Sequence, residues 1–196
     1  MSVLIFATNN NNKIQEIRSI LNDSMQIIGL REAGIFTDIP EPHPTLEENA
    51  REKSTFIFKL TNSDCFSEDT GLEVFSLNGE PGVKSARYAG DENDNQKNIE
   101  KLLQNMALVN DRRAQFRTVI SLIENGIEIQ FEGICKGNII ETQRGEKGFG
   151  YDSIFIPDGS DKTFAEMEIA EKNIFSHRKK ATSKLIDFLN KNHGKN

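Results

Sequence analysis

The sequence has no tryptophan, few cysteines and no long apolar run. Its two cysteines, Cys65 and Cys135, fit reduced thiols better than a disulfide framework, and neither has a neighbour at the spacing of a zinc ligand. No stretch approaches the roughly 20 apolar residues that a membrane-spanning helix needs. The opening MSVLIFATNN is too short and too weakly basic an apolar run for a signal peptide. These absences predict a cytoplasmic protein with reduced thiols and no membrane partner.

Acidic residues outnumber basic ones, and the formal net charge is -6. This negative net charge argues against a protein that binds duplex nucleic acid through a positively charged face. A single nucleotide remains a possible ligand, because one small anion needs only a local basic pocket. The 196 residues suit one domain, residues 1–196. A domain of this size can bury a hydrophobic core without disulfides or a structural metal.

Apolar periodicity predicts a mixed α/β domain with an elongated sheet at its centre. The predicted strands are Ser2–Ala7, Met25–Leu30, Cys65–Phe66, Leu72–Leu77, Ala114–Glu124, Ile127–Cys135 and Ser153–Ile156. Helices are predicted after Asn12, after Thr45, at Asn98–Met106 and from Ser176. The helix after Thr45 is expected to carry Leu46, Ala50, Ile57 and Leu60 inward. Thr45 and Glu48 fit a capping box at its start.

A polar segment, Thr8–Lys13, lies where the first strand passes into a helix. Backbone N–H groups at a helix start point toward an anion, and the helix dipole favours negative charge there. Thr8 and Asn10 add side-chain donors and Lys13 adds a positive charge, so a triphosphate fits this place. The alternative interpretation is an asparagine-rich cap followed by a solvated lysine.

A pair of carboxylates, Glu68 and Asp69, precedes Thr70 and Gly71. A turn at Ser67–Gly71 would aim both carboxylates at one metal ion, which a continuing strand would not do. Mg²⁺ takes one or two carboxylates together with waters and substrate phosphates. Glu41, on a loop stiffened by prolines, offers a further oxygen. The alternative is a polar turn in which Gly71 supplies a positive φ.

Near the C-terminus, the sequence GFGYD is followed by Lys172 and by Ser176–Arg178. Phe149 and Tyr151 offer stacking faces, and the flanking glycines let backbone approach a ligand closely. Lys172 and Arg178 offer positive charge. Together these groups could hold a planar heterocycle and an anion; the alternative is an ordinary turn before a buried strand, followed by a basic helix start.

Taken in order, five motifs resemble those of the inosine triphosphate pyrophosphatases. The motifs are Thr8-x-Asn10-x-x-Lys13, Glu68-Asp69-Thr70-Gly71, Pro81-Gly82 with Ser85–Tyr88, Gly148–Asp152, and Lys172 with Ser176–Arg178. The resemblance extends from residue 3 to about residue 190. Asn9 stands where this family often has glycine, and Ser153 replaces a common proline.

The resemblance implies a long, strongly curved mixed sheet and two lobes with a nucleotide cleft between them. It also implies a homodimer and Mg²⁺-dependent hydrolysis of ITP, dITP and XTP to the monophosphate and pyrophosphate.

The site roles also follow from the resemblance, position by position. The implied phosphate-binding residues are Thr8, Asn9, Asn10, Asn11, Asn12 and Lys13, with Lys13 as the main cation. Asp69 is implied to bind metal and to act as the base or the water-orienting group, with Glu41 and Glu68 assisting at the metal. The implied substrate contacts are Thr70, Phe149, Gly150, Tyr151, Asp152, Lys172, His177 and Arg178.

A second hypothesis is a nucleotide-binding regulatory module without turnover. Such a module would keep Lys13 and Phe149 but lack a competent carboxylate. Because Asp69 is present beside Lys13, the enzyme is the favoured interpretation.

Overall fold

The structure is a computed structural model that describes residues 2–21 and 25–193. The chain forms two compact units that interleave along the sequence. The first unit contains Met1–Asp69, Thr118–Gly133 and Arg178–Asn196, and the second contains Thr70–Arg117 and Ile134–His177. Strands β3 (Cys65–Val74), β5 (Arg113–Glu124) and β6 (Ile127–Ile139) each contribute residues to both units.

In the described part of the chain, seven strands form one mixed sheet in the order β2-β1-β3-β5-β6-β7, with β4 paired to β3. The strands are β1 Ser2–Phe6, β2 Met25–Gly29, β3 Cys65–Val74, β4 Pro81–Gly82, β5 Arg113–Glu124, β6 Ile127–Ile139 and β7 Phe155–Pro157. Strand β1 pairs in parallel with β2 and β3, whereas β4 and β7 pair antiparallel to β3 and β6. The predicted mixed α/β fold is therefore confirmed.

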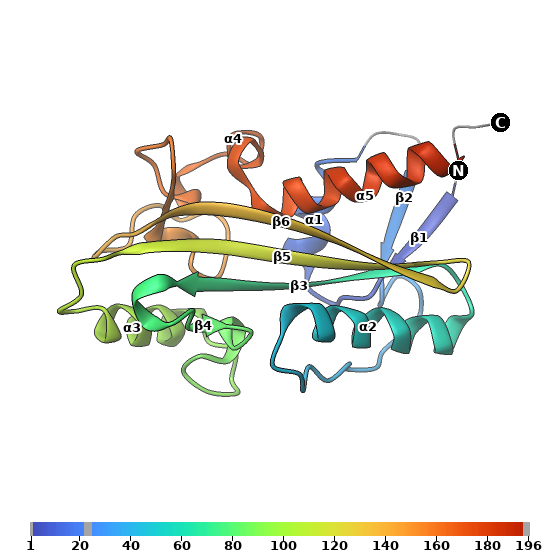
Figure 1. Cartoon of the computed structure of the whole chain (residues 1–196), viewed down its shortest axis with the longest axis horizontal. Coiled ribbons are helices and arrows are strands. Elements are labelled where there is room, and N and C mark those ends of the chain that lie inside the picture. The colour runs from blue at the N-terminus through green and yellow to red at the C-terminus, as the bar shows by residue number, and fades with distance from the viewer. Residues whose placement is uncertain (1, 22–24, 194–196) are drawn as a thin grey trace. The chain divides into compact units, whose positions relative to one another are not determined.

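Five α-helices lie within the described residues: α1 Asn11–Arg18, α2 Leu46–Thr61, α3 Asn95–Asn105, α4 Ile169–Phe175 and α5 His177–His193 (Figure 1). Short 3-10 turns occur at Phe75–Leu77, Ser85–Arg87, Asp152–Ile154 and Phe164–Glu166. None of the described helices has the length and apolarity needed to cross a bilayer.

In the first unit, side chains of β1 alternate between two apolar clusters. Leu4 and Phe6 pack in a cluster with residues of α1 and α5, and Ile5 packs against another that contains Ile57 of α2. Successive strand residues point to opposite faces of a sheet, so α1 and α5 cover one face and α2 covers the other (Figure 1). A polar side chain of the neighbouring strand β3 therefore faces either α1 and α5 or α2, depending on the side of the sheet to which it points.

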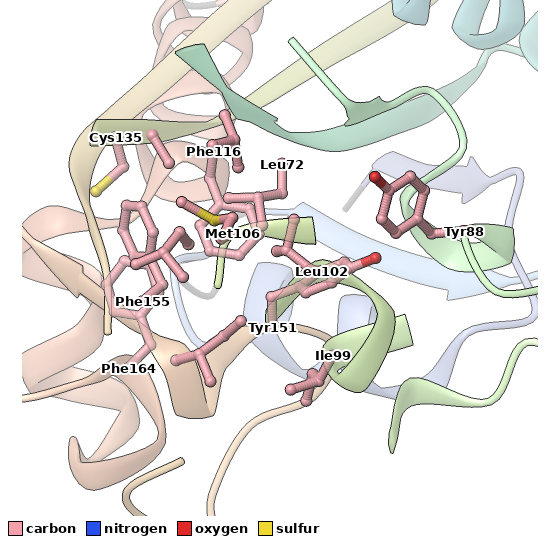
Figure 2. Close-up of a cluster of buried hydrophobic side chains, with 14 of the residues drawn as sticks. Leu72, Tyr88, Ile99, Leu102, Met106, Phe116, Cys135, Tyr151, Phe155 and Phe164 are labelled. Atoms are coloured by element: carbon pink, nitrogen blue, oxygen red, sulfur yellow. The ribbon is translucent and has the colours of Figure 1, made fainter. Parts of the chain in front are cut away.

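The second unit has its own core, drawn in Figure 2. Three aromatic rings, Phe116, Phe155 and Phe164, pack together with centroids 4.7–6.0 Å apart. Leu102 of α3 and Met106, which caps the end of α3, are fully buried in the same cluster. The core draws on β3, β5, β6 and α3 and also contains Tyr151. It therefore holds the Gly148–Asp152 segment in place.

Most predicted elements are confirmed, including the hairpin of β5 and β6. Its turn is Asn125-Gly126, and both residues have the positive φ that a tight hairpin turn needs. Thr45 caps α2 as predicted, since its hydroxyl accepts from the Glu48 N–H at 3.2 Å. Helix α4 was not predicted, and Leu60, expected inside, is 56% exposed.

The predicted turn at Ser67–Gly71 is wrong. Strand β3 runs through it without interruption from Cys65 to Val74, and Gly71 does not adopt a positive φ. A Cβ at Gly71 would lie 2.5 Å from the carbonyl oxygen of Gly82, so the glycine allows β4 to pair closely. The strand also ends earlier than predicted, and Phe75–Leu77 forms a 3-10 turn.

Candidate active site

The Thr8–Lys13 segment forms the start of α1. The Asn10 side chain caps the helix by accepting from the Lys13 N–H at 3.2 Å, and Thr8 Oγ1 accepts from the Asn10 N–H at 3.1 Å. A cavity of about 130 Å³ borders the segment at Thr8, Asn9 and Asn11. At roughly 30 Å³ per water molecule, this volume has room for a phosphoryl group. The predicted cap is thus present together with space for a small anion.

Alternation along β3 separates its two carboxylates. Phe66 and Glu68 lie on the face covered by α1 and α5, whereas Cys65, Ser67 and Asp69 lie on the face covered by α2. Glu68 is 2% exposed and Asp69 is 6% exposed. Each carboxylate therefore has its own set of partners.

Glu68 belongs to a buried charge network, the Glu68 cluster, formed by Lys13, Glu16, Glu68 and Arg178. The Arg178 guanidinium donates to both Glu68 oxygens, with Nε–Oε2 and Nη2–Oε1 distances of 2.8 and 2.9 Å, and also to Glu16. Lys13 Nζ lies 3.2 Å from Glu68 Oε1. Burial alone would raise the pKa of Glu68, but the charges of Arg178 and Lys13 outweigh it and hold that pKa well below its usual range.

Asp69 belongs to a second network, the Asp69 cluster, formed by Glu41, Asn49, Lys53 and Asp69. Lys53 Nζ contacts Glu41 Oε1 at 2.5 Å and Asp69 Oδ1 at 3.1 Å. Burial raises the pKa of Asp69, and the nearby charge of Glu41 adds to that effect, although Lys53 opposes it. Burial would lower the pKa of Lys53, but the two carboxylates outweigh it and raise that pKa. The Lys53 ammonium thus forms ion pairs with two carboxylates, and these three charged groups together carry a net negative charge.

The Asp69 cluster suits a divalent cation. No group of three His, Cys, Asp or Glu side chains among residues 2–21 and 25–193 forms a ready metal site. Mg²⁺, however, needs only one or two protein carboxylates, because waters and substrate phosphates complete its shell. Glu41 and Asp69 already place oxygens around a single cationic atom, Lys53 Nζ. Metal binding by Glu68 stays a prediction, and its contacts given above are with Lys13 and Arg178.

The second unit holds a third polar group, the Asp152 cluster, formed by Phe149, Asp152, Phe164 and Lys172. Asp152 Oδ2 accepts from the Phe149 N–H at 2.9 Å and from Lys172 Nζ at 2.7 Å. The same ammonium lies 5.4 Å from the Phe149 ring centroid and 5.1 Å from that of Phe164. Asp152 and Lys172 are buried and Phe149 is half-buried, so an aromatic face stands beside a fixed pair of charges.

Position 148 has no room for a side chain, because the carboxylate of Asp152 lies against it. The φ of Gly148 is +74°, and a Cβ there would lie 2.1 Å from Asp152 Oδ2. Gly148→Ala is expected to lower the free energy of unfolding by about 2–3 kcal/mol, because the left-handed backbone strain of about 1 kcal/mol adds to a displaced buried ion pair. Urea unfolding would measure the loss.

Gly150→Ala is the matched control. Gly150 also has a positive φ, +61°, but nothing lies within 4 Å of its Cβ position. Only the backbone strain applies there, about 1 kcal/mol. Equal losses in the two variants would contradict the role assigned to Gly148.

Three other residues predicted to contact the substrate lie in the second unit, and one of them, Tyr151, is labelled in Figure 2. Tyr151 is a core residue whose hydroxyl donates to the Ser85 carbonyl at 2.9 Å. His177 is 3% exposed and stacks on Phe116 at a centroid distance of 4.8 Å. Thr70, the residue after Asp69 on β3, is half-buried. Their predicted contact with a substrate stays a prediction.

Sequence reasoning missed three charged or polar residues of these clusters: Glu16, Asn49 and Lys53. A signal was present, because Ala50, Lys53 and Ile57 follow the spacing of one helix face and all are buried. A lysine at a core-facing position needs a charged partner. That requirement points to a buried carboxylate opposite α2, although it does not say which one.

Comparison with known proteins gives a consistent result along the whole chain. A family model described as the Ham1 family matches residues 4–188. A dITP/XTP pyrophosphatase of Flavobacterium johnsoniae is 50% identical over 95% of this chain and 97% of its own length. A protein of the same name from Porphyromonas gingivalis is 48% identical over 96% of this chain and 98% of its own.

Solved structures show the same similarity. The Ham1 protein of Staphylococcus aureus superposes with a TM-score of 0.88 at 41% identity, covering 97% of this chain and all of that one. A nucleoside-triphosphatase / dITP/XTP pyrophosphatase of Mycobacterium abscessus gives a TM-score of 0.76 at 34% identity, covering 94% of this chain and 99% of its own.

Proposed function

Because this chain belongs to the Ham1 family, we propose that it is a nucleoside-triphosphate pyrophosphatase acting on the deaminated purine nucleotides dITP, ITP and XTP. The products are the nucleoside monophosphate and pyrophosphate. The names of relatives that match nearly the full chain support the reaction class. The observation that carries the proposal is the Asp69 cluster, in which Glu41 and Asp69 both pair with Lys53. Asp69 lies on β3, the strand that also carries Glu68.

We place the phosphates at the start of α1. The helix start offers backbone donors, and Lys13 offers a positive charge that Glu68 holds in place at 3.2 Å. The other residues proposed to bind the phosphates are Thr8, Asn9, Asn10, Asn11 and Asn12. Pyrophosphate leaves more readily when its developing charge is neutralised by such preorganised groups.

Asp69 orients the attacking water or accepts its proton. Lys53 Nζ, 3.1 Å from Asp69 Oδ1, holds this carboxylate in position, as a base within hydrogen-bond reach of its water requires. Glu41 and Asp69, with Glu68 assisting, form the proposed Mg²⁺ ligand set. The bound ion supplies charge neutralisation on the phosphates.

The Asp152 cluster is proposed to receive the purine. Phe149 stacks on the base, and Lys172 donates toward a 6-oxo group, where adenine would present a donor of its own. The other proposed substrate contacts are Thr70, Gly150, Tyr151, Asp152, His177 and Arg178. We also propose that the protein acts in the cytoplasm as a homodimer, with Ser85–Tyr88 as a candidate interface segment.

The test is a panel of nucleotides incubated with purified protein, with and without Mg²⁺. ITP, dITP and XTP are expected to release pyrophosphate and the monophosphate only when Mg²⁺ is present, and ATP is expected to react far more slowly. Chromatography of the products distinguishes the outcomes. Release of IDP and orthophosphate from ITP would contradict cleavage after the first phosphate.

A further inference from the structure

Asn49 is a buried amide that contacts the loop that carries Glu41 and also Asp69 on strand β3. It lies one helical turn before Lys53 on α2 and is 1% exposed. Its Oδ1 accepts from the His43 N–H at 2.9 Å, and its Nδ2 donates to the His43 carbonyl at 3.1 Å. The same Nδ2 lies 3.4 Å from Asp69 Oδ2, a long contact. One side chain therefore joins the loop before α2 to strand β3.

The loop that carries Glu41 has few backbone N–H groups through which it can be held. In the segment from residue 40 to residue 44, prolines at positions 40, 42 and 44 provide no backbone N–H. Only Glu41 and His43 retain one, and Asn49 accepts the hydrogen bond from His43. Because His43 is two residues from Glu41, this clamp limits how far the Glu41 carboxylate can move from Lys53 and Asp69.

We infer that Asn49 is a positioning residue that holds Glu41 and Asp69 at the separation needed to share one divalent cation. The inference rests on the proposed function, since it takes these two carboxylates as metal ligands. Side chains that orient metal ligands without touching the metal typically cost 10–100-fold in metal affinity when removed. A clamp that only stabilised the loop would change the stability of the protein and leave metal affinity unaltered.

Asn98 provides a matched control for the structural role alone. It is also a buried amide, 2% exposed, and it clamps backbone on both sides. Its Oδ1 accepts from the Ala89 N–H at 2.6 Å, and its Nδ2 donates to the Ala86 carbonyl at 2.9 Å. These contacts lie within the second unit, and neither involves a carboxylate.

The experiment measures Mn²⁺ binding to the nucleotide-free protein by electron paramagnetic resonance, with urea unfolding in parallel. Asn49→Ala is expected to weaken Mn²⁺ binding by about 10–100-fold. Asn98→Ala is expected to lose stability with little change in Mn²⁺ binding. Asn49→Leu, which nearly preserves volume, provides a folded variant if alanine destabilises too far, and it should weaken Mn²⁺ binding in the same way.

The outcomes separate the inference from the proposed function. If the wild type binds Mn²⁺ and both Asn49 variants bind it equally well, Asn49 is only a structural clamp and the inference fails. If the variants lose Mn²⁺ but the wild type releases no pyrophosphate from any nucleotide, the positioning role stands and the proposed reaction fails. If the wild type binds no Mn²⁺, the proposed metal site and the inference both fail.

Discussion

Asp69→Asn is expected to reduce the rate of pyrophosphate release by about 10²–10⁴-fold, the range typical for loss of a positioned base. An amide has nearly the shape of the carboxylate, so the packing of β3 against α2 is preserved. It cannot accept a proton from water, and it weakens the attraction to Lys53 and to a divalent cation. Nucleotide binding should survive, because Lys13 and the Asp152 cluster are unaltered. Steady-state rates and equilibrium binding of ITP measure the two effects separately.

Glu73→Gln is the control on the same strand. Glu73 is also a carboxylate of β3, but it accepts a hydrogen bond from the Gln115 side chain at 2.7 Å and takes no part in the Asp69 cluster. Its variant should keep nearly full turnover. If Asp69→Asn also kept most of its turnover, Asp69 would not be the base. If the wild type bound ITP without turnover, the regulatory module would be the correct interpretation.

The elements that could be predicted are those determined by local sequence. The Asn125-Gly126 turn, the Thr45 cap and the apolar spacing of α3 and α5 each depend on residues within a few positions of one another. Such signals remain valid in the folded protein because their hydrogen bonds and side-chain faces are themselves local. The cap in the Thr8–Lys13 segment belongs to this group, since Asn10 and Lys13 meet within a single turn.

The path of β3 could not be predicted in the same way. Ser67–Gly71 has the composition of a turn, yet it forms a buried strand because partners from distant segments satisfy its polar side chains. Glu68 meets Arg178, which is 110 residues away, and Ser67 donates to the carbonyl of Ala50. Pairings of this kind depend on the tertiary fold, so the sequence alone did not assign Arg178 to Glu68 or Lys53 to Asp69.

Arg178→Met is expected to give the largest loss of stability, about 3–5 kcal/mol, the cost typical of removing one partner from a buried ion pair. Arg178 is 1% exposed and donates to both Glu68 and Glu16. Without it, Glu16 loses that cation, and Glu68 keeps only Lys13 of the two that lower its pKa. Urea unfolding at neutral pH measures the loss.

The pH dependence follows from the shifted pKa of Glu68. In the wild type that pKa is depressed, so its stabilising contribution is present at neutral pH and is lost as the pH falls through the acid range. In Arg178→Met the largest cause of that depression is removed, so Glu68 contributes less stability at neutral pH and has less to lose in acid. The difference in unfolding free energy between the two proteins should therefore stay nearly constant above about pH 5 and shrink as the pH falls further.

Arg51→Met tests whether burial is the cause. Arg51 Nε forms a comparable contact with Glu128 Oε2 at 2.8 Å, but its side chain is 57% exposed. An exposed pair of this kind contributes about 1 kcal/mol or less, because water and salt screen it. Arg178→Lys should fall between these two variants, since it keeps one charge but cannot reach both carboxylates as a guanidinium does. If Arg178→Met lost no more stability than Arg51→Met, the guanidinium would not be balancing the buried carboxylates.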